Sequence, residues 1–113
     1  MTPEGEILKG ILDYLAAVKV WAMRINTGAV VSEYKGKTRF HRYGRPGCAD
    51  ILATTFNMCE CGGQGFVRVI WIEVKTATGK QSDAQLEFQK EVENEGHTYI
   101  VARSIDDVRR LFE

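Results

Sequence analysis

Hydrophobic residues near the start of the chain recur at helical spacing and predict an amphipathic helix. Thr2 is suited to cap this helix, Pro3 takes its first position, and we expect the helix to end near Ala17. The stripe that would face the core comprises Ile7, Leu8, Ile11, Leu12 and Leu15.

Short apolar runs farther along the chain predict four strands. They cover residues 20–25, 49–53, 66–74 and 99–102. Residues 26–28 signal a turn after the first run, and the glycine-rich stretch 57–65 predicts a hairpin turn into the third. The third run is apolar on both faces, which is typical of an inner strand.

Two further helices follow the third run. Ser82 and Gln85 have the spacing of a capping box, at the start of a helix that Gly96 would end. Ser104 is suited to cap a final helix, and the inward residues of that helix would be Ile105, Val108, Leu111 and Phe112. The order helix, strand, strand, strand, helix, strand, helix predicts an α/β fold with a central mixed sheet flanked by helices. The helix between the third and fourth strands would be a crossover connection.

One segment interrupts this alternation of helices and strands. Residues 33–47 are polar, basic and glycine-containing, so we predict a loop or a mobile arm there. A length of 113 residues fits one compact core better than two. We therefore assign residues 1–113 to a single domain that carries this arm.

Composition narrows the class of protein. Hydrophobic residues make up 44% of the chain and charged residues 27%, which is typical of a globular soluble protein. No apolar run is long enough to cross a bilayer, and residues 1–4 lack the basic and apolar regions of a signal peptide. We therefore expect a cytoplasmic protein with no membrane partner. The net charge is zero, so any attraction to nucleic acid must be local.

The three cysteines are more typical of free thiols in a reducing compartment than of a disulfide framework. They are Cys48, Cys59 and Cys61. A structural zinc site needs four ligands, usually with paired CxxC spacing, which Cys59 and Cys61 do not show. One alternative stays open: a zinc-stabilised interaction protein that uses Cys59, Cys61 and either Cys48 or His41.

Candidate chemistry concentrates at Asp50 and at the triplet Glu73-Val74-Lys75. Residues two apart on a strand share a face, so Glu73 and Lys75 would project together. Taken alone, this triplet is weak evidence, because most Glu-x-Lys triplets only mark the point where a strand leaves the core and meets solvent. Asp50 changes the interpretation, because it lies at the start of another predicted strand, and pairing of the two strands would bring two carboxylates together.

Two adjacent carboxylates repel each other by on the order of 4 kcal/mol at an effective dielectric of about 20, so they call for a cation or a proton. Hard oxygen ligands favour Mg²⁺ or Mn²⁺ over zinc. The carbonyl of Val74 could supply another oxygen. The ammonium of Lys75 could orient an attacking water and stabilise negative charge that develops on a phosphate.

Two side chains on predicted helices could complete this site. Glu4 continues the inward stripe of the first helix, whereas Glu6 projects from nearly the opposite face, so we assign Glu4 to the metal site. Interaction with the helix dipole explains Glu4 equally well. The role of Gln85 also has two interpretations. It fits the capping box, and it lies on the helix face that would reach a site beside the strands.

A basic tract immediately precedes Asp50. It contains Lys35, Lys37, Arg39, His41, Arg42 and Arg45, interleaved with Tyr34, Phe40 and Tyr43. Such a cluster can bind DNA phosphates even in a neutral protein, and we prefer this interpretation to an ordinary solvated hairpin because the tract adjoins the candidate site. His41 is more typical of a phosphate contact than of a general base. Asn26 and Thr27 could also contact the substrate, although turn formation explains them adequately.

Taken together, these motifs resemble the VRR-NUC branch of the PD-(D/E)XK nucleases. The resemblance covers nearly the whole chain and rests on Glu4, Arg24 to Gly28, Gly44 to Leu52, Ile72 to Thr76, Gly79 and Ser82 to Gln85. It implies a three-layer restriction-endonuclease-like core and metal-dependent cleavage of phosphodiester bonds. By this resemblance Asp50 and Glu73 would be metal ligands, Lys75 the catalytic lysine, Glu4 the helix acid and Gln85 a supporting residue. Leu8 departs from the pattern, because many relatives carry glutamine there.

The resemblance also bears on substrate and assembly. Stand-alone members of this branch are small viral or bacterial proteins, and some act as homodimers on four-way DNA junctions. We therefore predict an endonuclease that depends on Mg²⁺ or Mn²⁺, leaves a 5′ phosphate, and acts as a Holliday-junction resolvase in the bacterial or phage-infected cytoplasm. The alternative from another class is a DNA-binding module without catalysis, which would use the acids only for structure.

Overall fold

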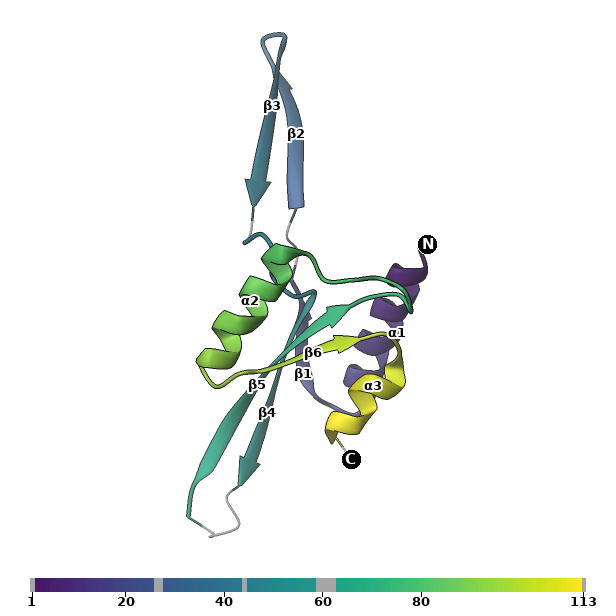
Figure 1. The fold of residues 1–113 in the computed structure, drawn as a ribbon, viewed down its shortest axis with the longest axis vertical. Coiled ribbons are helices and arrows are strands. Elements are labelled where there is room, and N and C mark those ends of the chain that lie inside the picture. Colours follow the sequence, from purple (N-terminus) through teal and green to yellow (C-terminus); the bar gives the residue numbers. More distant parts are fainter. Residues whose placement is uncertain (1, 26–27, 44, 59–62, 113) are drawn as a thin grey trace.

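A four-stranded mixed sheet forms the centre of the computed structural model, which describes residues 2–25, 28–43, 45–58 and 63–112 (Figure 1). The strands are β1 (Trp21–Arg24), β4 (Ile51–Met58), β5 (Gly65–Val74) and β6 (Thr98–Ala102), in the order β1-β4-β5-β6. β4 runs antiparallel to β1 and β5, whereas β6 is parallel to β5. The four predicted strands are therefore present, although β4 continues five residues beyond the predicted end.

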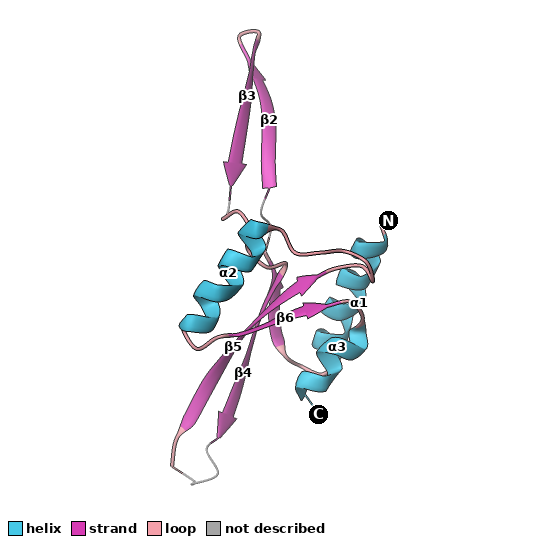
Figure 2. Ribbon diagram, in the orientation of Figure 1, coloured by secondary structure: helices cyan, strands magenta, loops and turns pink. Residues whose placement is uncertain are grey.

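Helices cover both faces of this sheet. α2 (Asp83–Asn94) connects the parallel strands β5 and β6 and lies on one face, while α1 (Pro3–Ala17) and α3 (Ile105–Arg109) lie on the other (Figure 2). A short 3₁₀ turn, Arg110–Phe112, follows α3. The three layers and the crossover helix confirm the predicted α/β class. No helix in the described part of the chain combines the length and apolarity needed to cross a bilayer.

The alternation of side chains along β5 divides the core into two clusters. Ile70, Ile72 and Val74 pack with the apolar stripe of α1, in which Leu8, Ile11 and Leu15 are buried. Trp71 packs on the opposite face, with its ring edge-on to Phe88 of α2 at a centroid distance of 5.1 Å. Residues of odd number on β5 therefore face α2, and residues of even number face α1.

The caps of the two long helices agree with prediction, but the cap of the last helix does not. The Thr2 hydroxyl accepts a hydrogen bond from the Gly5 amide at 3.0 Å, and Gly96 ends α2 with a φ of 85°. Ser104 makes no side-chain cap hydrogen bond. Instead the Asp107 carboxylate accepts from the Arg103 amide at 2.8 Å, so an acid in the first turn replaces the hydroxyl that we expected.

The segment predicted as a loop forms a β-hairpin that projects from the sheet as an arm (Figure 1). β2 (Gly28–Tyr34) pairs in antiparallel register with β3 (Lys37–Tyr43). Lys35 and Gly36 form a two-residue turn with φ angles of 51° and 72°, the left-handed geometry that suits hairpin turns. The prediction of a loop was therefore wrong, because this segment is a paired hairpin. The molecule measures 64 Å along its longest axis and 28 and 25 Å along the other two.

At the other end of the molecule β4 and β5 continue past their neighbours as a two-stranded ribbon, residues 55–58 and 65–69. Phe56 is 68% exposed and Val67 is 62% exposed on this ribbon. The prediction that β5 is an inner strand therefore holds for residues 70–74, which lie between β4 and β6. It is wrong for the first half of β5, which has only β4 beside it.

Candidate metal centre

Strand pairing brings Asp50 and Glu73 together. Ile51 pairs with Ile72 in the antiparallel register of β4 and β5, so one further step sets Asp50 opposite Glu73. The Asp50 amide donates to the carbonyl of Ile72 at 3.1 Å, and the Asp50 carboxylate accepts from the amide of Val74 at 2.8 Å. These two contacts fix the Asp50 carboxylate at the end of β5, where the sequence predicted it.

Glu73 is a buried carboxyl group, with only 2% of the residue exposed. Burial, the charge of Asp50 and a hydrogen bond with Asp50 together raise the pKa of Glu73 to about 8, although the ammonium of Lys75 acts in the opposite direction. Glu73 Oε2 has no hydrogen-bond partner within the described residues. A buried carboxyl pair with an unsatisfied oxygen needs either a proton or a cation.

Gln85 performs both of the roles that the sequence left open. Its side-chain carbonyl accepts from the Ser82 amide at 2.8 Å, and its own amide donates to the Ser82 hydroxyl at 3.2 Å, which completes the capping box. The Gln85 Nε2 group then donates to Glu73 Oε1 at 3.0 Å. One residue therefore starts α2 and orients a carboxylate of the candidate site.

Lys75 lies beside the carboxyl pair at the end of β5. Its Nζ is 3.8 Å from Glu73 Oε1, and its side chain is 14% exposed. The turn after Lys75 is held by Arg103, whose Nη1 donates to the carbonyls of Thr76 at 2.6 Å and Gly79 at 2.8 Å. Sequence reasoning missed Arg103, because nothing except its place after the last strand indicates this contact.

Glu4 approaches the carboxyl pair from the other face of the sheet. A pocket of about 370 Å³ is lined by Thr2, Glu4, Gly5, Leu8, Arg24, Asp50 and Val74. Glu4 is exposed on α1 rather than buried in its inward stripe. No three His, Cys, Asp or Glu residues in the described ranges are spaced to hold one ion. The geometry therefore supports a two-carboxylate core, and the participation of Glu4 stays a prediction.

A comparison with solved structures agrees with this architecture. A structure titled "VRR_NUC domain" aligns with 99% of this chain and 96% of its own length, at a TM-score of 0.62 and 19% sequence identity. The chain has the fold of a VRR_NUC domain. No family model matches the sequence, and no curated protein matches it. At this level of identity the likeness establishes the fold, and the chemistry must be argued from the site.

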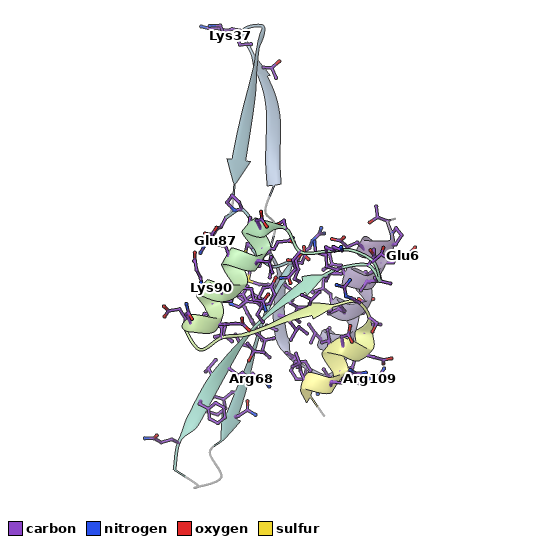
Figure 3. All side chains as sticks on the ribbon, viewed as in Figure 1. Glu6, Lys37, Arg68, Glu87, Lys90 and Arg109 are labelled. Carbon is purple, nitrogen blue, oxygen red and sulfur yellow. The ribbon has the colours of Figure 1, made fainter. Side chains whose placement is uncertain are left out.

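In this VRR_NUC fold, most of the predicted DNA-binding residues lie on the arm. Lys35 belongs to its turn, and Lys37 is exposed at its tip (Figure 3). Arg39, His41 and Arg42 are on β3, at positions that pair with Ser32, Val30 and Ala29 of β2. Asn26 lies outside the described residues, as do Thr27, Cys59 and Cys61.

Arg45 differs from the rest of the basic tract because it contacts the body of the protein. Its guanidinium forms an ion pair with Glu91 of α2 and lies 5.4 Å from the centroid of the Phe88 ring. Gly47 follows with a φ of 80°, and a side chain there would collide with the backbone of Ala84. These contacts attach the end of the arm to α2, the helix that carries Gln85.

Cys48 is a free thiol beside the cluster of Ala49 and Phe88. Burial raises the pKa of Cys48, so the protonated thiol is favoured. Within the described ranges no group of metal-binding residues surrounds Cys48. The zinc alternative therefore gains no support from this part of the chain.

Proposed function

We propose that this chain is a DNA endonuclease that depends on Mg²⁺ or Mn²⁺ and hydrolyses phosphodiester bonds. The observation that carries the proposal is the pairing of Asp50 with the buried Glu73, with the Lys75 ammonium 3.8 Å from the Glu73 carboxylate. The VRR_NUC fold supports it, because VRR_NUC is the name of a nuclease domain.

The residues at the end of β5 fit a hard divalent cation. Asp50 and Glu73 would hold it. The Val74 carbonyl and Glu4 would be further oxygen donors, because Val74 and Glu4 line a pocket together with Asp50. Such a cation lowers the pKa of water and offsets negative charge on a phosphate. A bound cation would also give Glu73 Oε2 a partner, which this buried oxygen lacks within the described residues.

The protein's own groups would have separate tasks in the reaction. Lys75 neutralises charge on the phosphate in the transition state, because its ammonium projects from the same strand face as Glu73. Gln85 holds Glu73 Oε1, so the carboxylate keeps one orientation. Water attacks phosphorus and loses a proton, the bond from phosphorus to the 3′ oxygen breaks, and the 3′ oxygen leaves as a hydroxyl after it takes up a proton. The phosphate remains on the 5′ end of the downstream fragment.

We further propose that the substrate is branched DNA and that a homodimer cuts two strands of a four-way junction, as a Holliday-junction resolvase does. The basic arm supplies phosphate contacts away from the body of a small domain. The exposed apolar residues Trp21, Met23, Phe56 and Val67 provide surface that a second copy of the chain could bury.

Incubation of labelled linear, flapped and four-way DNA with purified protein tests this function. Mg²⁺ or Mn²⁺ should support cleavage, with the four-way DNA cut fastest, and EDTA should abolish it. Glu73→Gln should bind DNA without cutting it, which separates the nuclease from a non-catalytic DNA-binding module. Failure to cut any DNA with either metal would contradict the proposal. A monomer that cuts linear and four-way DNA equally would contradict its junction-specific part.

A further inference from the structure

Arg24 ends the edge strand β1 beside the carboxyl pair. It pairs with Ile51, the residue after Asp50, and the next amide along the chain, that of Ile25, donates to the Asp50 carbonyl at 2.7 Å. The backbone that carries Arg24 is therefore fixed to the backbone that carries Asp50. The Arg24 side chain therefore starts from a defined position relative to the Asp50 carboxylate.

The side chain of Arg24 lies at the junction of two pockets. It lines the pocket of about 370 Å³ that also contains Glu4, Asp50 and Val74. It also lines a second pocket of about 430 Å³ between α1 and β1, together with Leu8 and Leu12. Because Gly5 and Leu8 line both spaces as well, the two pockets adjoin along α1. A DNA strand that lay across both pockets would run beside Arg24.

Arg24 has no protein partner within the described residues: it makes neither a hydrogen bond nor an ion pair there. This is notable because two acids, Glu4 and Asp50, line the same pocket. Arg45 and Arg103 differ from Arg24, since Arg45 pairs with Glu91 and Arg103 bonds to backbone carbonyls. The five donors of the Arg24 guanidinium are thus available to an anion.

Arg24 and Lys75 flank the carboxyl pair from opposite faces of the sheet. Arg24 shares its face with Ile51 and Ile72, which pack against α1. Lys75 shares its face with Glu73 and Trp71 and therefore lies on the side of α2. A phosphate beside the carboxylates could be contacted by one cation from each face.

We infer that Arg24 binds a backbone phosphate of the DNA strand at the candidate site, with its guanidinium as a bidentate donor to the phosphate oxygens. This inference rests on the proposed nuclease function and adds a substrate-binding residue to it. It also places the strand across both pockets, along α1 beside Leu8 and Leu12. Arg24 lies on the body of the protein, so its contact is distinct from those of the arm.

DNA binding in Ca²⁺, which replaces Mg²⁺ so that strand cleavage does not complicate the measurement, tests the inference directly. Fluorescence anisotropy of a fluorescein-labelled four-way DNA should give a Kd about tenfold higher for Arg24→Ala than for the unchanged protein. The slope of log affinity against log salt should fall by about one, the amount expected for one phosphate contact. Arg24→Lys should recover part of the affinity, because it keeps the charge and loses the bidentate geometry.

Arg68→Ala is the matched control. Arg68 lies on β5, five residues before Glu73, and its Nε donates to the Thr98 hydroxyl at 3.3 Å; Figure 3 shows it toward the ribbon end of the sheet. This variant should keep both the Kd and the salt slope. Circular dichroism of Arg24→Ala and Arg24→Gln should match that of the unchanged protein, because the side chain is exposed and makes no contact that supports the fold.

The outcomes separate this inference from the proposed function. If the unchanged protein cuts DNA while Arg24→Ala binds and cuts equally well, Arg24 is a solvated surface residue and the inference is wrong. A loss of affinity as large in Arg68→Ala as in Arg24→Ala would overturn it too. If the unchanged protein cuts no DNA but Arg24→Ala still weakens binding, the phosphate contact stands and the nuclease proposal fails. No binding by the unchanged protein would overturn both.

Discussion

The candidate site and the basic arm place charge in opposite environments. At the site Glu73 is 2% exposed and has Asp50, Lys75 and Gln85 as immediate neighbours. On the arm, the described side chains of Lys35 and Lys37 are exposed on a two-stranded hairpin that projects from the sheet. Buried charges interact strongly over short distances, whereas exposed ones are screened by salt. We therefore expect changes at the site to alter the rate of cleavage and changes on the arm to alter the affinity for DNA.

The largest expected effect comes from Glu73→Gln, which keeps the shape of the side chain and removes its charge. Cleavage should fall by about a thousandfold or more, because the cation loses a ligand. The Kd for DNA in Ca²⁺ should change by less than about threefold if the arm provides most of the affinity. Initial rates measure cleavage, and fluorescence anisotropy of labelled DNA measures the Kd, with the same protein preparation used for the two assays. If Glu73→Gln lost DNA binding as well as cleavage, the claim that the site serves cleavage and the arm serves binding would be wrong.

Lys75→Ala should lower kcat by about a hundredfold or more, with little change in KM, since the ammonium acts on charge that develops in the transition state. Lys80→Ala is a suitable control, because Lys80 is exposed beyond the turn that Arg103 holds. Single-turnover kinetics distinguish the two. A variant that raises KM and leaves kcat intact would make Lys75 a DNA-binding residue of the same kind as those on the arm.

Gln85→Ala should reduce cleavage by about tenfold to a hundredfold, because Glu73 Oε1 loses the donor that orients it. The same change removes half of the capping box, which costs about 1 kcal/mol of stability. Ser82→Ala provides the comparison, since it breaks the other half of the box and leaves the contact with Glu73. Thermal unfolding and cleavage rates should show equal destabilisation but unequal activity. Equal activity in the two variants would assign Gln85 to capping alone.

Replacement of Lys37, Arg39 and Arg42 by alanine should weaken DNA binding by about tenfold or more, with a shallower salt slope and unchanged kcat at saturating DNA. The change removes charge from the arm and leaves every residue of the site. Salt titration by fluorescence anisotropy measures the slope. If kcat fell and affinity did not, the arm would act in chemistry rather than in binding.

The smallest effect is expected for Arg45→Ala, which releases the end of the arm from Glu91 of α2. This ion pair is exposed to solvent and weakened by screening, so stability should barely change. Affinity should fall by about twofold to threefold, because a less constrained arm loses more entropy on binding. Glu91→Ala should reproduce the decrease. If Arg45→Ala weakened binding and Glu91→Ala did not, Arg45 would instead contact a DNA phosphate directly.

Local patterns in the sequence predicted the parts of the fold that depend on near neighbours. The stripe of α1, the Thr2 cap and the Ser82 capping box are all set by residues within a few positions of one another. The meeting of Asp50 and Glu73 could also be predicted, because a hairpin between two apolar runs fixes which residues oppose each other. For Gln85 the sequence left capping and a contact with the site as alternatives, and the structure shows that the residue makes both contacts.

Features that depend on long-range packing could not be predicted in the same way. The arm was predicted as a loop because its charged residues obscure the strand pattern, and its turn uses Lys35-Gly36 rather than the more recognisable Asn-Gly. Arg103 supports the turn after Lys75 only because β6 lies beside β5. The sequence included Arg24 in the VRR-NUC resemblance, but a phosphate-binding role for it could be inferred only from the pockets that it lines.

Direct titration of Mn²⁺ tests the central claim that the paired carboxyl groups of Asp50 and Glu73 hold a divalent cation. Isothermal titration calorimetry of the unchanged protein should show saturable binding that releases protons near pH 7, because the raised pKa of Glu73, about 8, leaves it protonated without metal. Glu73→Gln should lose the binding and the proton release together. Undiminished Mn²⁺ binding by Glu73→Gln, or none by the unchanged protein, would contradict the account.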